Sequence, residues 1–484
     1  MLHRSESNSI LKTAKTPLRR NRLLVRPATI RVLAFLTLVA LVILLSIDNL
    51  KRLFQNDNMI GEEGTKIIQS LCEHHQQQSP GSVLEKSNQI LLEHQRASHT
   101  ANEDHISMDT VIDDNTWKDL PVKGAFYMVV DSGDLQHIRA SIRSVEDRFN
   151  HQFRYPWILL SNQHLTASFR NYITKLTTSP IFFGKIDAAL WDYPSWVSGV
   201  RAEEYMNYFS SSDVKHASSF LFRQRARYHA GFFFHHSLLQ NVEYAWRVEP
   251  GSDYSCIMDT DPFVEMEQRN KTMGFILTER EEPLAVRSLY PLTLQFMKEN
   301  LQLMAPLKES IFPWLVDNKD PMYAKANGFN YCQIESNFMI VKLSYLRSPE
   351  YQSYFSFLDS TGGFYYERWN DASVQTMAAA MFLPRSQLHF FNHIGYTFER
   401  QMHCPWRSTD LGTCSCDITS ATGKWVMRGG KKRVGGDAIR GCTLDLVRLL
   451  DKNILHQVAQ FANKYQDSLG VGDAIGKLLA RPPI

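Results

Sequence analysis

The feature that most constrains this chain is an uncharged, apolar run near its start. Residues 32–47 read VLAFLTLVALVILLSI. At roughly 1.5 Å per residue, a helix over this run would span about 24 Å. That is short for a bilayer but sufficient for a thin membrane with interfacial residues at its ends. We therefore expect a transmembrane signal anchor, which forces the remainder of the chain to fold on one side of a membrane.

The charges around residues 32–47 predict the orientation of the anchor. Residues 1–31 are basic, with Glu6 as their only acid, whereas Asp48, Lys51 and Arg52 follow the run. An excess of Lys and Arg before the span predicts a cytoplasmic tail over 1–31 and a luminal remainder. A cleaved signal peptide would lie nearer the start and show a cleavage site, and a buried core helix would show a polar face. The basic residues of the tail are Arg4, Lys12, Lys15, Arg19, Arg20, Arg22, Arg26 and Arg31.

Composition divides the rest of the chain into three parts. Residues 48–118 are polar and include the segment EHHQQQSPGS at 73–82, which favours a solvated luminal stem over a metal site. A globular texture follows over 119–428, and 429–484 form a C-terminal extension, for which a basic loop and solvated helices are expected. The net charge of +3 gives no indication of nucleic-acid binding, and we expect no such partner.

The start of the globular part predicts an α/β fold. Residues 125–130 (AFYMVV) form a compact apolar run typical of a buried strand, and 157–160 form a second one. Between them, Ile138, Ile142 and Val145 recur at helical spacing. Strand, helix and strand with short links indicate a parallel βαβ unit.

Cysteines and a sequon fit a luminal domain. Six of the seven cysteines lie beyond the stem, and an even set in the secretory pathway is typical of disulfides, although the sequence leaves their pairing open. Asn270-Lys271-Thr272 is a glycosylation sequon that requires exposure in the lumen. The cysteines are Cys72, in the stem, and Cys256, Cys332, Cys404, Cys414, Cys416 and Cys442.

An acidic block carries the first chemical signal. Residues 246–250 (WRVEP) read as a strand that ends in Glu249, and Asp253, Asp259 and Asp261 follow. A nucleotide-sugar donor carries a charged diphosphate, and hard oxygen ligands at a strand end can hold the metal that bridges its oxygens. The alternative is an acidic surface loop.

Two aromatic blocks accompany the acidic one. Residues 362–372 (GGFYYERWNDA) combine paired glycines with aromatic rings and carboxylates that can bind sugar hydroxyls. The alternative is an ordinary turn before a half-buried segment. Residues 227–236 (RYHAGFFFHH) read as a buried aromatic helix.

Taken together, these blocks resemble the fungal α-1,2-mannosyltransferases of glycosyltransferase family 15, over roughly residues 120–416. The resemblance implies a GT-A-like α/β domain with a mixed central sheet, preceded by a transmembrane helix and a stem. It also implies a single-pass type II Golgi membrane protein that uses GDP-mannose and Mn²⁺, retains the anomeric configuration and extends mannosylated glycoproteins. The matching motifs are 155–157 (YPW), 191–196 (WDYPSW), 227–228 (RY), 231–233 (GFF), 246–250, 336–338 (SNF), 347–349 (RSP), 365–369 (YYERW), 394–396 (IGY) and 404–405 (CP).

The resemblance assigns roles by position. Glu249 would bind the metal, Arg247 lies beside it, and Tyr228 matches an active-site tyrosine. The donor and acceptor site would be lined by Glu367, Arg368, Trp369 and Asp371.

The chain departs from the family at five of its motif positions. Gly251 stands in place of the Asp of Glu-Pro-Asp, and Met339 in place of a glutamate proposed as the nucleophile. Phe398 replaces a histidine that ligates manganese, while Asp131 and Gln375 replace an arginine and a histidine. Methionine cannot attack an anomeric carbon, and phenylalanine cannot ligate a metal.

Three explanations of these departures are open. Glu335 could act as the catalytic carboxylate and His393, or else His389, as the metal ligand. Alternatively, the acceptor could attack on the face from which the donor phosphate leaves, so that no nucleophile is needed. Finally, the chain could be a catalytically impaired partner in a complex with other mannosyltransferases. A changed donor or linkage is a further alternative.

Overall fold

The structure is a computed structural model that describes residues 111–212, 214–317, 328–405, 410–416, 442–451 and 453. The chain divides into two compact units, Met1–Gln69 and Ser70–Ile484, and every described residue belongs to the second. The tail, the anchor at 32–47 and most of the stem lie outside the described residues. Within the described ranges, no helix is both long and apolar enough to cross a membrane.

A mixed sheet of seven strands forms the centre of the described unit, in the order β10-β6-β9-β4-β1-β2-β3. Strand β9 is antiparallel to both of its neighbours, and the other pairs are parallel. This confirms the mixed α/β fold. The strands are β1 (Gly124–Val129), β2 (Trp157–Ser161), β3 (Ile181–Lys185), β4 (Tyr244–Val248), β6 (Met273–Phe275), β9 (Phe338–Lys342) and β10 (Leu388–Phe390).

Two small sheets flank the large one. Strands β12 (Gln401–His403), β11 (Tyr396–Phe398) and β5 (Asp253–Tyr254) form a three-stranded antiparallel sheet. Strands β7 (Thr278–Arg280) and β8 (Cys332–Ile334) form an antiparallel pair.

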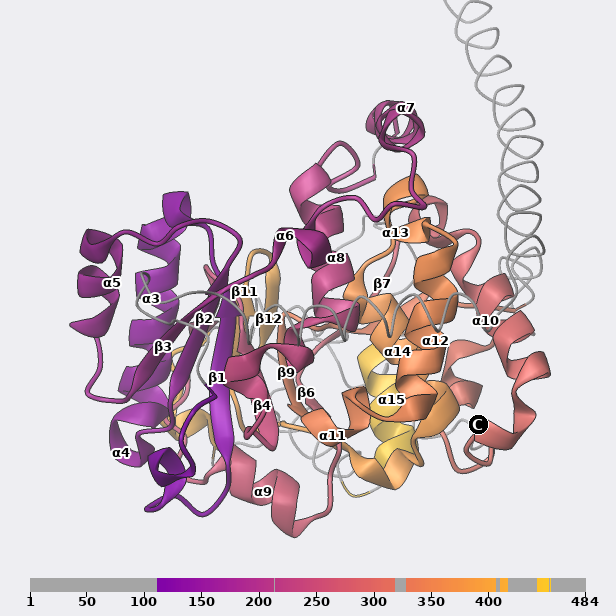
Figure 1. Ribbon diagram of the computed structural model, residues 1–484. Helices are drawn as coiled ribbons and strands as arrows, with labels where there is room; N and C mark the ends of the chain where they lie inside the picture. The colour runs from indigo at the N-terminus through magenta and orange to yellow at the C-terminus, as the bar shows by residue number, and fades with distance from the viewer. Residues whose placement is uncertain are drawn as a thin grey trace, which may run out of the picture. The chain divides into compact units, whose positions relative to one another are not determined.

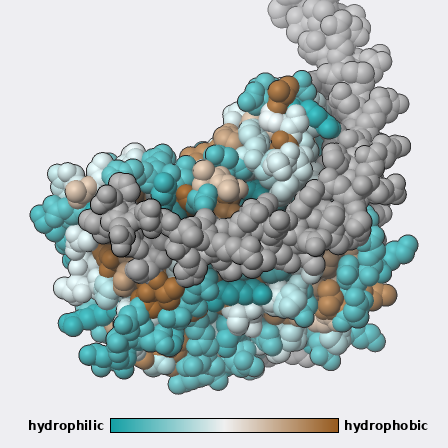
Figure 2. Space-filling view, in the orientation of Figure 1, coloured by the Kyte–Doolittle hydropathy of each residue, from teal (hydrophilic) through white to brown (hydrophobic). Residues whose placement is uncertain are grey.

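Helices cover both faces of the large sheet. Figure 1 shows α3 and α5 on one side of the sheet and α8, α12 and α14 on the other. Figure 2 shows the hydrophobic residues of one surface in small groups between hydrophilic ones, which is ordinary for a globular protein. The helices are α3 (Leu135–Val145), α4 (His151–Phe153), α5 (Ala167–Thr174), α6 (Ala188–Trp191), α7 (Gly199–Ser210), α8 (Phe220–Gly231), α9 (Pro262–Gln268), α10 (Leu289–Glu299), α11 (Leu343–Leu346), α12 (Pro349–Ser360), α13 (Gly363–Tyr366), α14 (Asp371–Phe382) and α15 (Cys442–Leu450).

The predicted βαβ unit is present. Strands β1 and β2 pair in parallel, with Phe126 opposite Trp157, and α3 connects them. Ile138, Ile142 and Val145 are fully buried because their helical spacing puts them on the face of α3 that meets the sheet.

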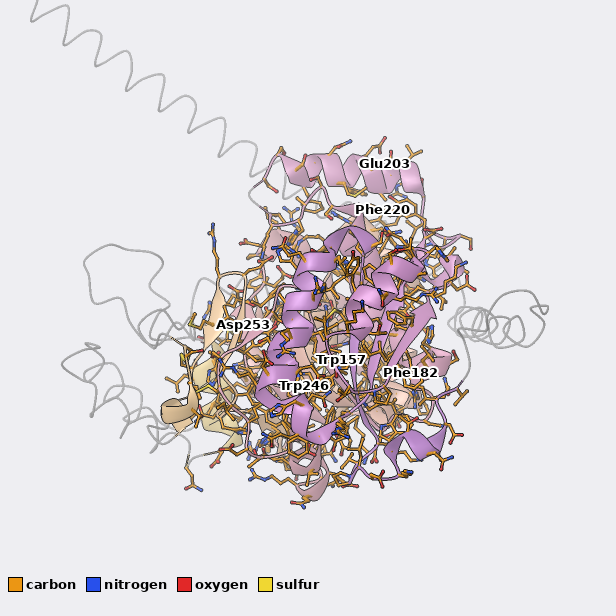
Figure 3. The ribbon with its side chains drawn as sticks, turned by 90° about the vertical axis from the view of Figure 1, so that its left-hand side faces the viewer. Trp157, Phe182, Glu203, Phe220, Trp246 and Asp253 are labelled. Carbon is orange, nitrogen blue, oxygen red and sulfur yellow. A yellow bond between two sulfur atoms is a disulfide. The ribbon has the colours of Figure 1, made fainter. Side chains whose placement is uncertain are left out.

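The face of the sheet beneath α3 forms the hydrophobic core. The ring of Phe126 stacks on Trp157 at 4.5 Å and lies 5.0 Å from Trp246. Figure 3, seen from the α3 side, labels both tryptophans at the level of this helix. We call this side, with Phe126, Trp157, Trp246 and Ile340, the apolar face. Its side chains anchor strands β1, β2, β4 and β9, on which the site is built.

All six cysteines beyond the stem form disulfides, which confirms that expectation. The pairs are Cys256–Cys414, Cys332–Cys442 and Cys404–Cys416. The expectation of solvated helices in the C-terminal extension is wrong for α15. Its residues Leu444, Leu446 and Val447 are buried, because Cys442 is bonded to β8 and the apolar side of the helix packs onto the domain.

Candidate active site

A row of three side chains crosses the large sheet on the face opposite the core. Tyr127 of β1 pairs with Arg247 of β4, which pairs with Met339 of β9. Because neighbours in register point to the same side, all three side chains share one face. We call it the polar face. It lies under α8 and α14, and the ring of Tyr127 stacks at 4.4 Å on Phe233, just beyond α8.

Arg247 connects two carboxylates from different parts of the chain. Its Nη1 donates to Oδ2 of Asp371 at 2.5 Å and to Oγ of Ser336 at 3.1 Å. Its Nε and Nη2 both donate to Oε2 of Glu249, at 3.0 and 2.9 Å. Burial alone would lower the pKa of Arg247, but Asp371 and then Glu249 raise it above its ordinary value. The guanidinium therefore stays charged and fixes both carboxylates.

The turn that carries Glu249 is fastened to α3. Oγ of Ser141 donates to the backbone oxygens of Glu249 and Ser252, at 3.3 and 2.9 Å, and accepts from the backbone nitrogen of Gly251 at 2.9 Å. Gly251 has a φ of +90°, a conformation that L side chains rarely adopt. An aspartate at this position would be strained, so the local backbone agrees with the glycine.

A second arginine approaches Glu249 from α8. Nη1 of Arg225 lies 3.9 Å from Oε1 of Glu249. Among the described residues, the buried Nε of Arg225 has no hydrogen-bond partner. Arg225 is only partly buried, so its guanidinium can meet a ligand at the end of β4.

Asp371 is placed by the start of α14. Oδ1 of Asn370 accepts from the backbone nitrogen of Ser373 at 2.7 Å and so caps the helix. Nδ2 of Asn370 donates to Oε2 of Glu281, whose other oxygen pairs with Arg368. The helix N-terminus favours the negative charge of Asp371, which then reaches Arg247.

Tyr228 lies on α8, the helix that covers the polar face. It is buried, and burial raises the pKa of its hydroxyl far above the ordinary value, so the group is neutral. The pKa of the adjacent His229 is lowered well below its ordinary value by burial and then by the charges of Arg247 and Arg225. Gln375 donates to the backbone oxygen of His229 at 3.0 Å and so ties α14 to α8.

Three of the predicted substrate-binding residues have protein partners instead. Oε2 of Glu367 accepts from the indole of Trp369 at 2.7 Å, and its two oxygens accept from the backbone nitrogen of Ser288 at 3.2 and 3.3 Å. Arg368 pairs with Glu281. Trp369 is fully buried, so its ring cannot stack on a sugar without leaving the core. These residues hold Asp371 in place rather than forming an open surface.

Glu335 lies in the turn between β8 and β9, next to Ser336, which bonds Arg247. Burial, followed by the charge of Glu279, raises the pKa of Glu335 to about 8. The carboxyl group therefore keeps its proton to a higher pH than an ordinary glutamate does. A protonated carboxyl is a hydrogen-bond donor, so the nucleophilic role expected of Glu335 would require prior loss of the proton.

His393, the expected second metal ligand, contacts other partners. Its Nε2 lies 3.7 Å from Oε2 of Glu265, on α9, and 3.4 Å from Oγ1 of Thr260. His389 meets the same glutamate at 3.1 Å. Among the described residues, only the sulfurs of Cys256, Cys414 and Cys416 bring three potential ligand atoms of His, Cys, Asp or Glu together, and these sulfurs are in disulfides. A site of Glu249, His393 and a third such ligand is therefore not assembled.

Sequence reasoning missed the site roles of Arg225, Tyr127 and Ser336. Each meets the site only through the tertiary fold. Tyr127 lies in the 125–130 run and Ser336 in the motif at 336–338, but neither pattern shows that the residue lies beside Arg247. Arg225 lies two residues before the 227–236 block, and helical periodicity alone does not show that it turns toward β4.

Comparisons with known proteins agree with the resemblance. The model of the family described as glycolipid 2-alpha-mannosyltransferase matches residues 77–426. O-glycoside alpha-1,2-mannosyltransferase homolog 2 of Schizosaccharomyces pombe is 35% identical over 308 residues, covering 64% of this chain and 80% of that protein. Glycolipid 2-alpha-mannosyltransferase 2 of Candida albicans is 36% identical over 284 residues, covering 59% of this chain and 60% of that protein.

Two solved structures share the fold. The mannosyltransferase Ktr4p of Saccharomyces cerevisiae in complex with GDP has a TM-score of 0.62 at 27% identity, covering 80% of this chain and 97% of that one. Core-mannan synthase A of Aspergillus fumigatus, in a Mn/GDP form, has a TM-score of 0.61 at 26% identity, covering 72% and 91%.

Proposed function

Because this chain belongs to the glycolipid 2-alpha-mannosyltransferase family, we propose that it transfers mannose from GDP-mannose to mannosylated glycans of glycoproteins and forms α-1,2 linkages. The observation that carries this proposal is the contact of Arg247 with both Glu249 and Asp371 at the carboxyl end of β4. Ligands of open α/β sheets bind at this edge.

The leaving group of the reaction is a nucleoside diphosphate, which needs positive charge as the glycosidic bond breaks. Arg225 and Arg247 supply two guanidinium groups at the strand end, and guanidinium suits phosphate oxygens because its donors are planar and paired. Glu249 accepts from Arg247 and faces Arg225, so it orients both groups.

Manganese is expected from the relatives, since the Aspergillus structure is a Mn/GDP form. In this chain, Oε2 of Glu249 already accepts twice from Arg247, and Phe398 offers no ligand atom. The described residues around Glu249 therefore do not fit a manganese site, and our mechanism uses no metal there. Binding of GDP that persists in EDTA would support this part of the proposal, and binding that needs Mn²⁺ and is lost in Glu249→Gln would contradict it.

The row of Tyr127, Arg247 and Met339 across the polar face bears on the stereochemistry of mannose transfer. Met339 stands in register with Arg247, so at this position no carboxylate is available to form a glycosyl-enzyme. We propose attack on the same face from which GDP leaves. The C1–O bond to phosphate breaks with its electron pair going to GDP, the acceptor oxygen bonds to C1, and its proton passes to the phosphate.

We also propose the type II Golgi topology. Residues 1–31 would be cytoplasmic, 32–47 would span the membrane, and the stem at 48–118 would carry the catalytic domain of 119–428 in the lumen. Three disulfides and the exposed Asn270 support a luminal domain. Since α15 is bonded to β8, we extend the catalytic unit to residue 450. A glycosidase-sensitive mobility shift that Asn270→Gln removes would support this topology, and a chain without glycan in fungal Golgi membranes would count against it.

The activity test uses the purified full-length protein with GDP-mannose and an α-mannobiose acceptor. We expect a product that an α-1,2-mannosidase trims, at a rate that Glu249→Gln lowers and Glu243→Gln does not. Glu243 is a suitable control because it pairs with Lys342 at the other end of β4. GDP binding without transfer to any mannoside would favour the alternative that Met339 raises, a catalytically impaired partner of other mannosyltransferases.

A further inference from the structure

One face of α3 runs along the segment that follows β4. His137, Ser141 and Ser144 stand at positions i, i+4 and i+7 of this helix, so they share that face. Ser141 fastens the turn at 249–252, and Oγ of Ser144 donates to Oδ1 of Asp253 at 2.8 Å. Two of the three side chains are therefore engaged with this segment. His137 is the third, and it lies one turn nearer the start of the helix.

The ring of His137 has Asp134 on one edge and Gly251 on the other. Its Nδ1 meets Oδ1 of Asp134, and Nδ1 is the donor because a carboxylate only accepts. On the opposite edge, Cδ2 lies 4.0 Å from the point at which a side chain on Gly251 would begin. Cδ2 is bonded to Nε2, so the ring edge that carries Nε2 is the one beside the turn after β4.

Nε2 of His137 is open to a ligand. The side chain is 65% exposed, and no hydrogen bond joins Nε2 to another described residue. An imidazole whose Nδ1 already donates carries a proton on Nε2 only in its charged form. Donation from Nε2 therefore comes with a positive charge, which suits an anionic oxygen.

His137 and Arg225 flank the same turn. Gly251, beside the His137 ring, is two residues after Glu249, and Nη1 of Arg225 lies 3.9 Å from Oε1 of Glu249. The chain adds β2 and β3 on one side of β1 and then β4 on the other, so the strand order reverses between β1 and β4. Ligands of open α/β sheets bind beyond the carboxyl ends of the strands at such a point. The turn after β4 and the start of α3, which follows β1, border this position.

We propose that His137 donates from Nε2 to the diphosphate of the sugar nucleotide and adds a positive charge to those of Arg225 and Arg247. Gly251 permits this approach, because among the described residues outside its chain neighbours only His137 comes within 4 Å of its missing side chain. An aspartate there would be strained and would bring a carboxylate toward the same ring. This inference rests on the proposed function, since it needs a sugar nucleotide at this edge of the sheet.

The test is GDP binding to the purified full-length protein, measured by calorimetry in EDTA and again with MnCl₂, so that a metal requirement does not hide the effect. We expect His137→Gln to weaken GDP binding about 10–100-fold, as for the loss of a hydrogen bond to a charged group. His137→Arg should recover most of the affinity, because a guanidinium also donates to phosphate. Binding of guanosine, which has no phosphate, should be equal in all three proteins.

The matched control is His151→Gln. His151 is also exposed, but it follows the other end of α3, where Nδ1 bonds the backbone oxygen of Glu146 at 2.8 Å. This variant should bind GDP as the wild type does. Because the His137 side chain is largely exposed, His137→Gln should have the thermal stability of the wild type, so a loss of GDP affinity would not reflect misfolding.

The outcomes separate this inference from the proposed function. Equal GDP affinity in the wild type and His137→Gln would overturn the role of His137 and leave the proposed function standing. A loss that extends to guanosine, or that His137→Arg does not recover, would also overturn it, because the side chain would then shape the pocket rather than supply charge. Absence of GDP binding by the wild type, with and without Mn²⁺, would overturn both.

Discussion

The two faces of the large sheet use the same strands for opposite purposes. On β4, Trp246 points into the apolar face and Arg247, the next residue, points into the polar face. The apolar face is closed by aromatic rings, whereas on the polar face one arginine is paired with two carboxylates. The apolar side chains hold the strands rigidly and so position the charged side chains of the other face. The same charged groups could not be buried inside the hydrophobic core.

The largest effect is expected from Arg247→Ala. It leaves Asp371 and Glu249 without their main partner, so the free energy of unfolding should fall by about 3–5 kcal/mol, as for a broken buried ion pair. The transfer rate of the remaining folded protein should fall by about 10²–10³-fold, as when a donor to a developing negative charge is removed. Urea unfolding and initial rates with GDP-mannose measure the two effects.

The control for Arg247 is Arg269→Ala. Arg269 pairs with Glu265 at 3.2 Å, but its side chain is 59% exposed, so stability should change by less than about 1 kcal/mol. If Arg247→Ala behaved like this control, the distinction between the two faces would be lost.

Trp246→Phe should lower the stability of the fold without lowering the rate of transfer by the folded protein. The indole is fully buried and donates to the hydroxyl of Tyr254 at 3.1 Å, so the smaller ring leaves a cavity and an unpaired hydroxyl. We expect a loss of about 1–3 kcal/mol in the free energy of unfolding. The rate per folded molecule should be nearly that of the wild type. A loss of rate without a loss of stability would contradict the structural role of the apolar face.

The sequence predicted the apolar face more completely than the polar one. The spacing of Ile138 and Ile142 and the run at 125–130 were enough for the βαβ unit, because apolar periodicity reflects local geometry. The resemblance assigned Arg247, Glu249 and Asp371 to one site, and in the structure Arg247 contacts both carboxylates. It did not show that Trp369 is buried or that His393 meets Glu265, because both depend on how distant segments pack. The same applies to Arg225 and to the burial of α15.

Removing the disulfide between β8 and α15 should have a moderate effect. Cys442→Ser breaks the disulfide between α15 and β8. This disulfide joins two residues that are 110 positions apart in the sequence. We expect the free energy of unfolding to fall by about 2–4 kcal/mol. Thermal unfolding of Cys442→Ser and of the matched double variant Cys332→Ser/Cys442→Ser measures it. Equal Tm values for the wild type and both variants would show that this disulfide adds nothing to the stability of the fold.

The smallest effect concerns pH. Burial raises the pKa of Glu335 to about 8 and that of Glu367 to about 7. The folded state therefore holds these protons more tightly than the unfolded state, so stability should fall as pH rises from about 4.5 toward 8. In EDTA, Glu335→Gln should reduce this fall by about 1 kcal/mol or more, while Trp246→Phe should leave its slope unchanged. A steeper fall in Glu335→Gln would contradict the raised pKa.

The most direct test of the account is an experimental structure of the full-length protein with GDP. We predict that the diphosphate lies at the carboxyl end of β4, within hydrogen-bond distance of the guanidinium of Arg225 or Arg247, with Glu249 beside it. A GDP molecule bound elsewhere, or a closed surface over Glu249 that leaves no space for a phosphate, would contradict the assignment of this site.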